Sequence, residues 1–99
     1  MKRYRFHPEA RLEYILAIDW YRERSESTPL RFTEEVEAAV ASARESPRRY
    51  RAYGYGASRV IVEGFPYSVV FRDTPDEIQV IAVAHAKRRP GYWRTRSFR

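Results

Sequence analysis

The chain has 99 residues, a hydrophobic fraction of 43% and no cysteine, which fits one folded domain over residues 1–99 and excludes disulfides and thiolate metal sites. Its formal net charge is +6, and no apolar run reaches the roughly 20 residues of a membrane span. Residues 78–99 contain no Asp or Glu and six Lys or Arg residues. On a domain expected to be cytoplasmic, this basic end favours nucleic acid, the ribosome or an acidic protein as the partner. The alternative is a tail that only adds solubility.

The first elements predicted are a strand over residues 3–7 and helices over about 8–24 and 28–46. The helical spacing of the apolar residues supports both helices, and each has a proline near its start. His7 is expected to cap the first helix and Thr28 the second. The short link between the helices predicts a helical hairpin.

The second half of the chain is predicted to be all strand and loop. The segment PRRYRAYGYGA, residues 47–57, is rich in glycine and arginine and is expected to be a loop. Strands are predicted over residues 59–63, 67–72 and 77–85, and their short turns indicate an antiparallel meander. The fold class is therefore α+β with the order β-α-α-β-β-β, and the helical hairpin packs on one face of an antiparallel sheet.

Alternation along these strands separates fully apolar sets of side chains from a mixed set. The helices need an apolar face to cover, so the apolar sets are expected beneath them. The mixed set contains Arg59, Arg72 and His85. These three side chains are therefore predicted to share an open face of the sheet, next to the basic tail.

The second half of the chain contains three characteristic segments, GFPYSVVFR, IQVIAVAH and KRRPGYWRTR. Together with the order of the elements, they resemble the RelE/ParE superfamily, the toxins of type II toxin–antitoxin pairs. The resemblance covers nearly the whole chain. It implies a toxin that needs no cofactor or metal and is held in a heteromeric complex by an acidic antitoxin, whose extended C-terminal segment wraps it. RelE-like members cleave mRNA on the ribosome, whereas ParE-like members inhibit DNA gyrase and are not nucleases.

Metal-free RNA cleavage requires transfer of protons and neutralisation of the phosphorane charge. By resemblance to the RelE-like nucleases, Arg59 and Arg72 would stabilise that charge, because arginine does not readily give up its proton. His85 is the best candidate for an acid or base, and Tyr92 would stack a base or transfer a proton. The remaining basic candidates would hold RNA or the ribosome: Arg48, Arg49, Arg51, Lys87, Arg88, Arg89 and Arg94.

Structural roles stay open for the same residues. Arg72 could form an ion pair at the end of its strand, and the His85 ring could bond to the backbone. Tyr92 and Trp93 could pack across the sheet and fix the tail. Many RelE-like nucleases have lysines before the second strand; this chain has none there, which leaves Glu63 as an alternative base.

The sequence favours a toxin that cleaves mRNA on the ribosome. Two alternatives remain: a ParE-like gyrase inhibitor without catalytic activity, and a non-toxic homologue that only binds the antitoxin.

Overall fold

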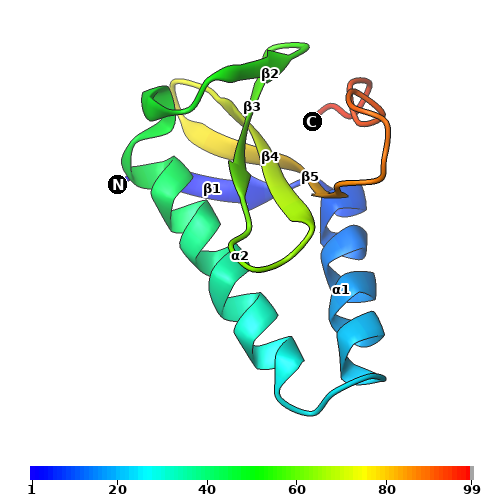
Figure 1. The fold of residues 1–99 in the computed structure, drawn as a ribbon. Coiled ribbons are helices and arrows are strands. Elements are labelled where there is room, and N and C mark those ends of the chain that lie inside the picture. Colours follow the sequence, from blue (N-terminus) through cyan, green and yellow to red (C-terminus); the bar gives the residue numbers. More distant parts are fainter. Residues whose placement is uncertain (99) are drawn as a thin grey trace.

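The computed structural model describes residues 1–98 and places two helices against a five-stranded sheet (Figure 1). The strands are β1 (Arg3–Phe6), β2 (Ala52–Gly54), β3 (Ala57–Ile61), β4 (Tyr67–Asp73) and β5 (Glu77–His85). The helices are α1 (Pro8–Arg22), α2 (Thr28–Glu45) and the short 3₁₀ helix η1 (Pro47–Arg49). Within these residues, neither long helix is apolar enough to cross a membrane.

The α+β class and the helical hairpin are confirmed, and β3, β4 and β5 form the predicted antiparallel meander. The strand order across the sheet is β1-β5-β4-β3-β2. Because β1 pairs with β5 in the parallel direction, the complete sheet is mixed. The first strand thus forms one edge of the sheet, beside the last strand, and the helical hairpin that follows it covers one face.

Residues 52–54, expected to be loop, form the extra edge strand β2 against β3. The turn between the two strands consists of Tyr55 and Gly56, whose φ values are 54° and 73°. Positive φ at both central residues is the geometry of a type I′ turn, the turn that best matches the twist of a hairpin. The glycines that suggested a loop are therefore the turn signal of a β-hairpin.

The two helix starts follow different rules. His7 is the N-cap of α1, and its Nδ1 atom accepts a hydrogen bond of 3.0 Å from the backbone N–H of Glu9, so this prediction is confirmed. The prediction of Thr28 as a cap is wrong by one residue. Ser27 is the N-cap of α2, and its side chain makes no capping bond. Its backbone is already in the helical region, with φ −93° and ψ −24°, so the helix includes Thr28.

Replacing His7 with alanine is expected to lower the free energy of unfolding by about 1 kcal/mol, because an N–H of the first turn loses its acceptor. Urea denaturation followed by circular dichroism measures the change. The variant His7→Asn should keep most of the stability, since asparagine is a good cap. The His7 ring also meets the Phe98 ring at 5.4 Å. Equal losses in the two variants would therefore assign the effect to that ring contact and contradict the capping role.

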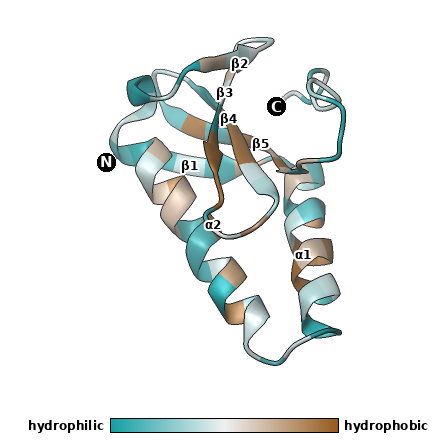
Figure 2. Ribbon diagram, in the orientation of Figure 1, coloured by the Kyte–Doolittle hydropathy of each residue, from teal (hydrophilic) through white to brown (hydrophobic). Residues whose placement is uncertain are grey.

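The main core lies between the helices and the sheet. The predicted apolar stripe of α2 is buried in it: Phe32, Val36, Ala39, Val40 and Ala43. Phe32 lies within 5.2 Å, centroid to centroid, of the rings of Tyr21, Phe65 and Tyr67. The hydrophobic colouring of Figure 2 is strongest on the central strands, which supply the opposite wall of this core.

The other face of the sheet is covered by residues 86–98, called the tail here, which fold back across it. Trp93 is fully buried there against Val70, Ile81 and Ala82. The sheet therefore has an apolar cluster on each face, one under the helices and one under the tail. The expectation of an open face is wrong because that face carries enough apolar surface to bind the aromatic part of the tail.

Candidate functional site

Arg59 and Arg72 lie on the same face of the sheet, the one that the tail covers, as the alternation predicted. Arg59 is paired with Val70 on β4, and Arg72 lies two residues beyond Val70. Side chains two residues apart on a strand share a face, and Val70 belongs to the cluster under the tail. The two arginines are thus both next to the tail.

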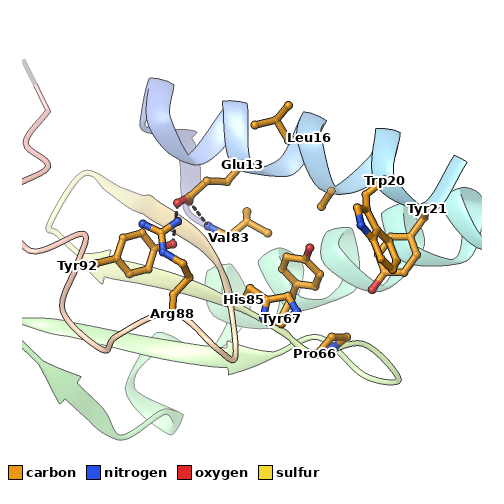
Figure 3. Close-up of a pocket in the computed structure, with 11 residues that line it drawn as sticks. Glu13, Leu16, Trp20, Tyr21, Pro66, Tyr67, Val83, His85, Arg88 and Tyr92 are labelled. Carbon is orange, nitrogen blue, oxygen red and sulfur yellow. Dashed lines mark hydrogen bonds between the residues drawn. The ribbon is translucent and has the colours of Figure 1, made fainter. Parts of the chain in front are cut away.

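The ring of His85 turns to the opposite face, beneath α1, so the prediction that it shares a face with the two arginines is wrong. At the end of β5 the residue nevertheless lines one small cavity together with Arg59. The register of β5 against β4 shifts at Ile81, which has no partner residue. Such a β-bulge reverses the alternation of every residue that follows it on the strand. His85 is therefore paired with Tyr67, and the two rings meet edge to face at 5.0 Å (Figure 3).

The imidazole of His85 is engaged with the backbone of its own turn. Its Nδ1 atom accepts a hydrogen bond of 3.0 Å from the N–H of Lys87. This contact stabilises the turn that leads from β5 into the tail. It is the backbone-bonded role that the sequence left open for this residue.

The guanidinium group of Arg72 holds the tail. It donates hydrogen bonds to the backbone carbonyls of Arg96, at 2.9 Å, and of Arg94, at 3.3 Å. The ion pair that the sequence left open for Arg72 is not among those of residues 1–98. Glu63, the alternative base, is exposed in the turn after β3 and lies on no strand.

The hydroxyl of Tyr92 is engaged by Glu13, a residue of α1 for which the sequence carried no signal. The hydroxyl donates to Oε2 of Glu13 at 2.7 Å. Arg96 donates to both oxygens of the same carboxylate, at 2.9 and 3.0 Å. The two side chains are only 15% and 16% exposed, so this is a largely buried, bidentate ion pair between α1 and the tail.

The Glu13–Arg96 pair also completes the backbone of β5. β1 ends at Phe6, and the last backbone contact there is from the N–H of His7 to the carbonyl of Val80. Beyond it, the N–H of Val83 donates to Glu13 at 3.0 Å, and the carbonyl of Ile81 accepts from Arg96 at 3.0 Å. A buried strand edge needs such partners. The Glu13–Arg96 pair therefore supplies hydrogen-bond partners to the backbone of β5 beyond the end of β1.

Two tyrosines have pKa values well above their ordinary value. Burial, reinforced by the hydrogen bond to Glu13, raises the pKa of Tyr92. Burial raises the pKa of Tyr14 from 10.0 to about 12, with a further contribution from Glu37. At neutral pH both phenols are protonated, and Tyr92 acts as a hydrogen-bond donor to the carboxylate.

Alkaline pH is expected to unfold the protein through these groups. A raised folded-state pKa means that their stabilisation is complete below the unfolded value of about 10 and is lost as pH rises toward the folded values. Titration of tyrosinate absorbance, run beside circular dichroism, should show at least two of the eight tyrosines ionising only as the fold is lost. If all eight ionised together near their ordinary pKa with the fold intact, the assignment would be wrong.

A groove of about 410 Å³ lies between α1 and the ends of β4 and β5 (Figure 3). Its main walls are Leu16, Trp20, Tyr21 and Tyr67, with His85 and Arg88 beyond them. Leu16 and Trp20 are 57% and 50% exposed. Two large apolar side chains exposed one turn apart on a helix, over a groove, indicate a surface that a partner covers.

The basic residues predicted to bind RNA or the ribosome are all exposed, and they fall into two groups. Arg48 and Arg49 are in η1 and Arg51 follows it, whereas Lys87, Arg88, Arg89 and Arg94 are in the tail. The structure brings Arg88 and Arg89 of the second group together with Arg59 around one small cavity. No group of His, Asp or Glu suited to a metal ion occurs within residues 1–98.

A helical hairpin on one face of a mixed sheet, with a meander that leads into a basic tail, is the fold of a RelE/ParE superfamily toxin. A family model described as the ParE toxin of the type II toxin–antitoxin system parDE matches residues 4–90, and the chain belongs to this family. It is similar in structure to the chromosomal ParDE TA system from P. aeruginosa, with a TM-score of 0.74 and 17% identity over 86% of this chain and 96% of that one. At that identity the likeness shows the fold alone. A search of curated proteins found no match.

Proposed function

We propose that this toxin acts by binding DNA gyrase and has no RNA-cleaving activity of its own. The observation that carries the proposal is that three of the four catalytic candidates are engaged in structural contacts within the protein. Arg72 donates to the backbone of the tail, the His85 ring packs on Tyr67 and accepts from the N–H of Lys87, and the hydroxyl of Tyr92 is bonded to Glu13. The match to the ParE family supports the same proposal.

The physical reason is positional. Metal-free cleavage needs an acid and a base within hydrogen-bond reach of the same phosphodiester, about 2.6–3.2 Å from the atoms they serve. The Nδ1 atom of His85 already accepts from the backbone, and the hydroxyl of Tyr92 already donates to a carboxylate. Neither group is therefore held ready to exchange a proton with a phosphodiester. An inhibitor that blocks an enzyme by binding needs only a stable surface. The mRNA endonuclease favoured from the sequence is therefore the less supported alternative.

We also propose that an acidic antitoxin covers the groove along α1. Leu16 and Trp20 would receive its apolar side chains, and Arg88 at the groove's end would pair with a carboxylate. None of the ion pairs within residues 1–98 involves Arg88. The similar structure is described as a ParDE TA system, which supports a toxin held by its antitoxin.

The test places the purified chain in two assays in parallel: DNA supercoiling by gyrase, and cleavage of mRNA on translating ribosomes. We expect supercoiling to be inhibited while the mRNA stays intact. Cut mRNA with normal supercoiling would replace the proposal with the nuclease. An effect in neither assay, with antitoxin binding retained, would identify a non-toxic homologue.

A further inference from the structure

A second, smaller cavity of about 70 Å³ lies between the tail and the sheet, and it is called the tail pocket here. Three arginines, one histidine and three aromatic rings supply its functional lining: Arg59, Arg88, Arg89, His85, Tyr53, Tyr92 and Trp93. They come from β2, β3, the end of β5 and the tail, so the pocket exists only because the tail folds back over the sheet.

The positive charge of the tail pocket is not neutralised by the protein. No Asp or Glu lines it, and within residues 1–98 none of its three guanidinium groups pairs with a carboxylate. Three like charges around one cavity repel each other, so the arrangement favours an anion between them.

Aromatic rings hold two of these arginines in place. The guanidinium carbon of Arg59 lies 4.2 Å from the ring centroid of Tyr53, and that of Arg88 lies 3.8 Å from the ring centroid of Tyr92. Such cation–π contacts restrict the side chains without using their N–H donors. The side chains of Arg88 and Arg59 are therefore partly ordered before a ligand binds. Binding then costs less conformational entropy, which favours it.

We propose that the tail pocket binds a phosphate group of duplex DNA. Its small volume suits one tetrahedral anion, and arginine forks match phosphate oxygens bidentately. Arg94 follows the pocket-lining Trp93 in the tail and is exposed, with its guanidinium 5.8 Å from the ring of Tyr55, so it can meet a neighbouring phosphate along the backbone. A single acidic side chain would not use that extra charge, whereas a repeating phosphate backbone does. The choice of DNA as the polyanion rests on the proposed function, because DNA lies in the gyrase complex.

Fluorescence anisotropy of a short labelled DNA duplex, with the purified toxin and no gyrase, tests this inference. The double variant Arg59→Gln/Arg89→Gln should bind about tenfold more weakly than the parent. Each lost phosphate contact should also reduce the slope of log affinity against log salt by about 0.9. Circular dichroism of the variant must match the parent, so that the loss is not one of folding.

The matched control is Arg11→Gln/Arg31→Gln, which removes the same charge from exposed positions on the two helices. It should keep nearly the parental affinity. An equal loss of DNA affinity in the control variant would overturn the proposal that the tail pocket binds phosphate. The affinity would then come from general attraction by the net charge of +6. Tighter binding of single-stranded RNA than of duplex DNA would overturn the choice of DNA.

The outcome is separable from that of the proposed function. A toxin that binds DNA through the tail pocket without inhibiting gyrase would refute the gyrase proposal and leave the pocket standing. A toxin that inhibits gyrase but has no measurable affinity for the duplex would refute the pocket as a phosphate site and leave the gyrase proposal standing.

Discussion

Trp93→Ala should lower the free energy of unfolding by about 3–5 kcal/mol, the ordinary cost of emptying a fully buried tryptophan site. Trp93 has no exposed surface and fills the cluster between the tail and the sheet. It also stacks on Tyr53 at 6.0 Å, with an interplanar angle of 27°, and meets Tyr55 edge to face at 6.1 Å. The total free energy of unfolding of a domain of this size is about 5–15 kcal/mol, so this one side chain accounts for a large share of the stability.

The chain supplies its own matched control, since it has two tryptophans. Trp20 is 50% exposed on α1 and contacts Tyr21 and Arg24, so Trp20→Ala should lower the stability by only about 1 kcal/mol. Chemical denaturation followed by far-ultraviolet circular dichroism gives both values. Trp93→Phe should fall between alanine and the parent. If Trp93→Ala were no more destabilising than Trp20→Ala, the tail would not be a structural part of the fold.

Much of the fold follows from local patterns in the sequence. The 3.6-residue spacing of Phe32, Val36 and Val40 predicts the buried side of α2, and alternation over Val69 and Phe71 predicts the helix-facing side of β4. These patterns hold because each element buries one face against a single layer. The first strand was predicted as well, but its parallel pairing with β5 is a long-range contact that no local pattern encodes.

The candidate site was harder to predict because it depends on one bulged residue. Ile81 is apolar, as are the residues on both sides of it, so the extra residue leaves the hydrophobic pattern of β5 unchanged. Nothing in the sequence therefore marks the point where alternation reverses. His85 consequently moves to the helix side while Arg59 and Arg72 stay on the other. The same gap in local information hides Glu13, whose role depends on where β1 ends.

Glu13→Ala is the second large effect that the structure predicts, at about 3 kcal/mol of lost stability. The variant would leave the guanidinium of Arg96 without its carboxylate in a largely buried position. It would also leave the N–H of Val83 and the hydroxyl of Tyr92 without acceptors. Each buried donor without an acceptor costs about 1–3 kcal/mol of stability, and the cost is smaller where a water molecule takes the place of the lost acceptor. The loss should therefore exceed that of an ordinary surface ion pair.

A double-mutant cycle separates the ion pair from the other contacts. Arg96→Ala should also be destabilising, because the carbonyl of Ile81 loses its donor. The double variant should lose less than the sum of the single losses, by about 1–3 kcal/mol, since two directly bonded groups are coupled. Glu34→Ala, at an exposed position on α2, is the control and should change little. Additive losses would mean that the carboxylate stabilises β5 and Tyr92 independently of Arg96, and the link between α1 and the tail would then depend on Tyr92 alone.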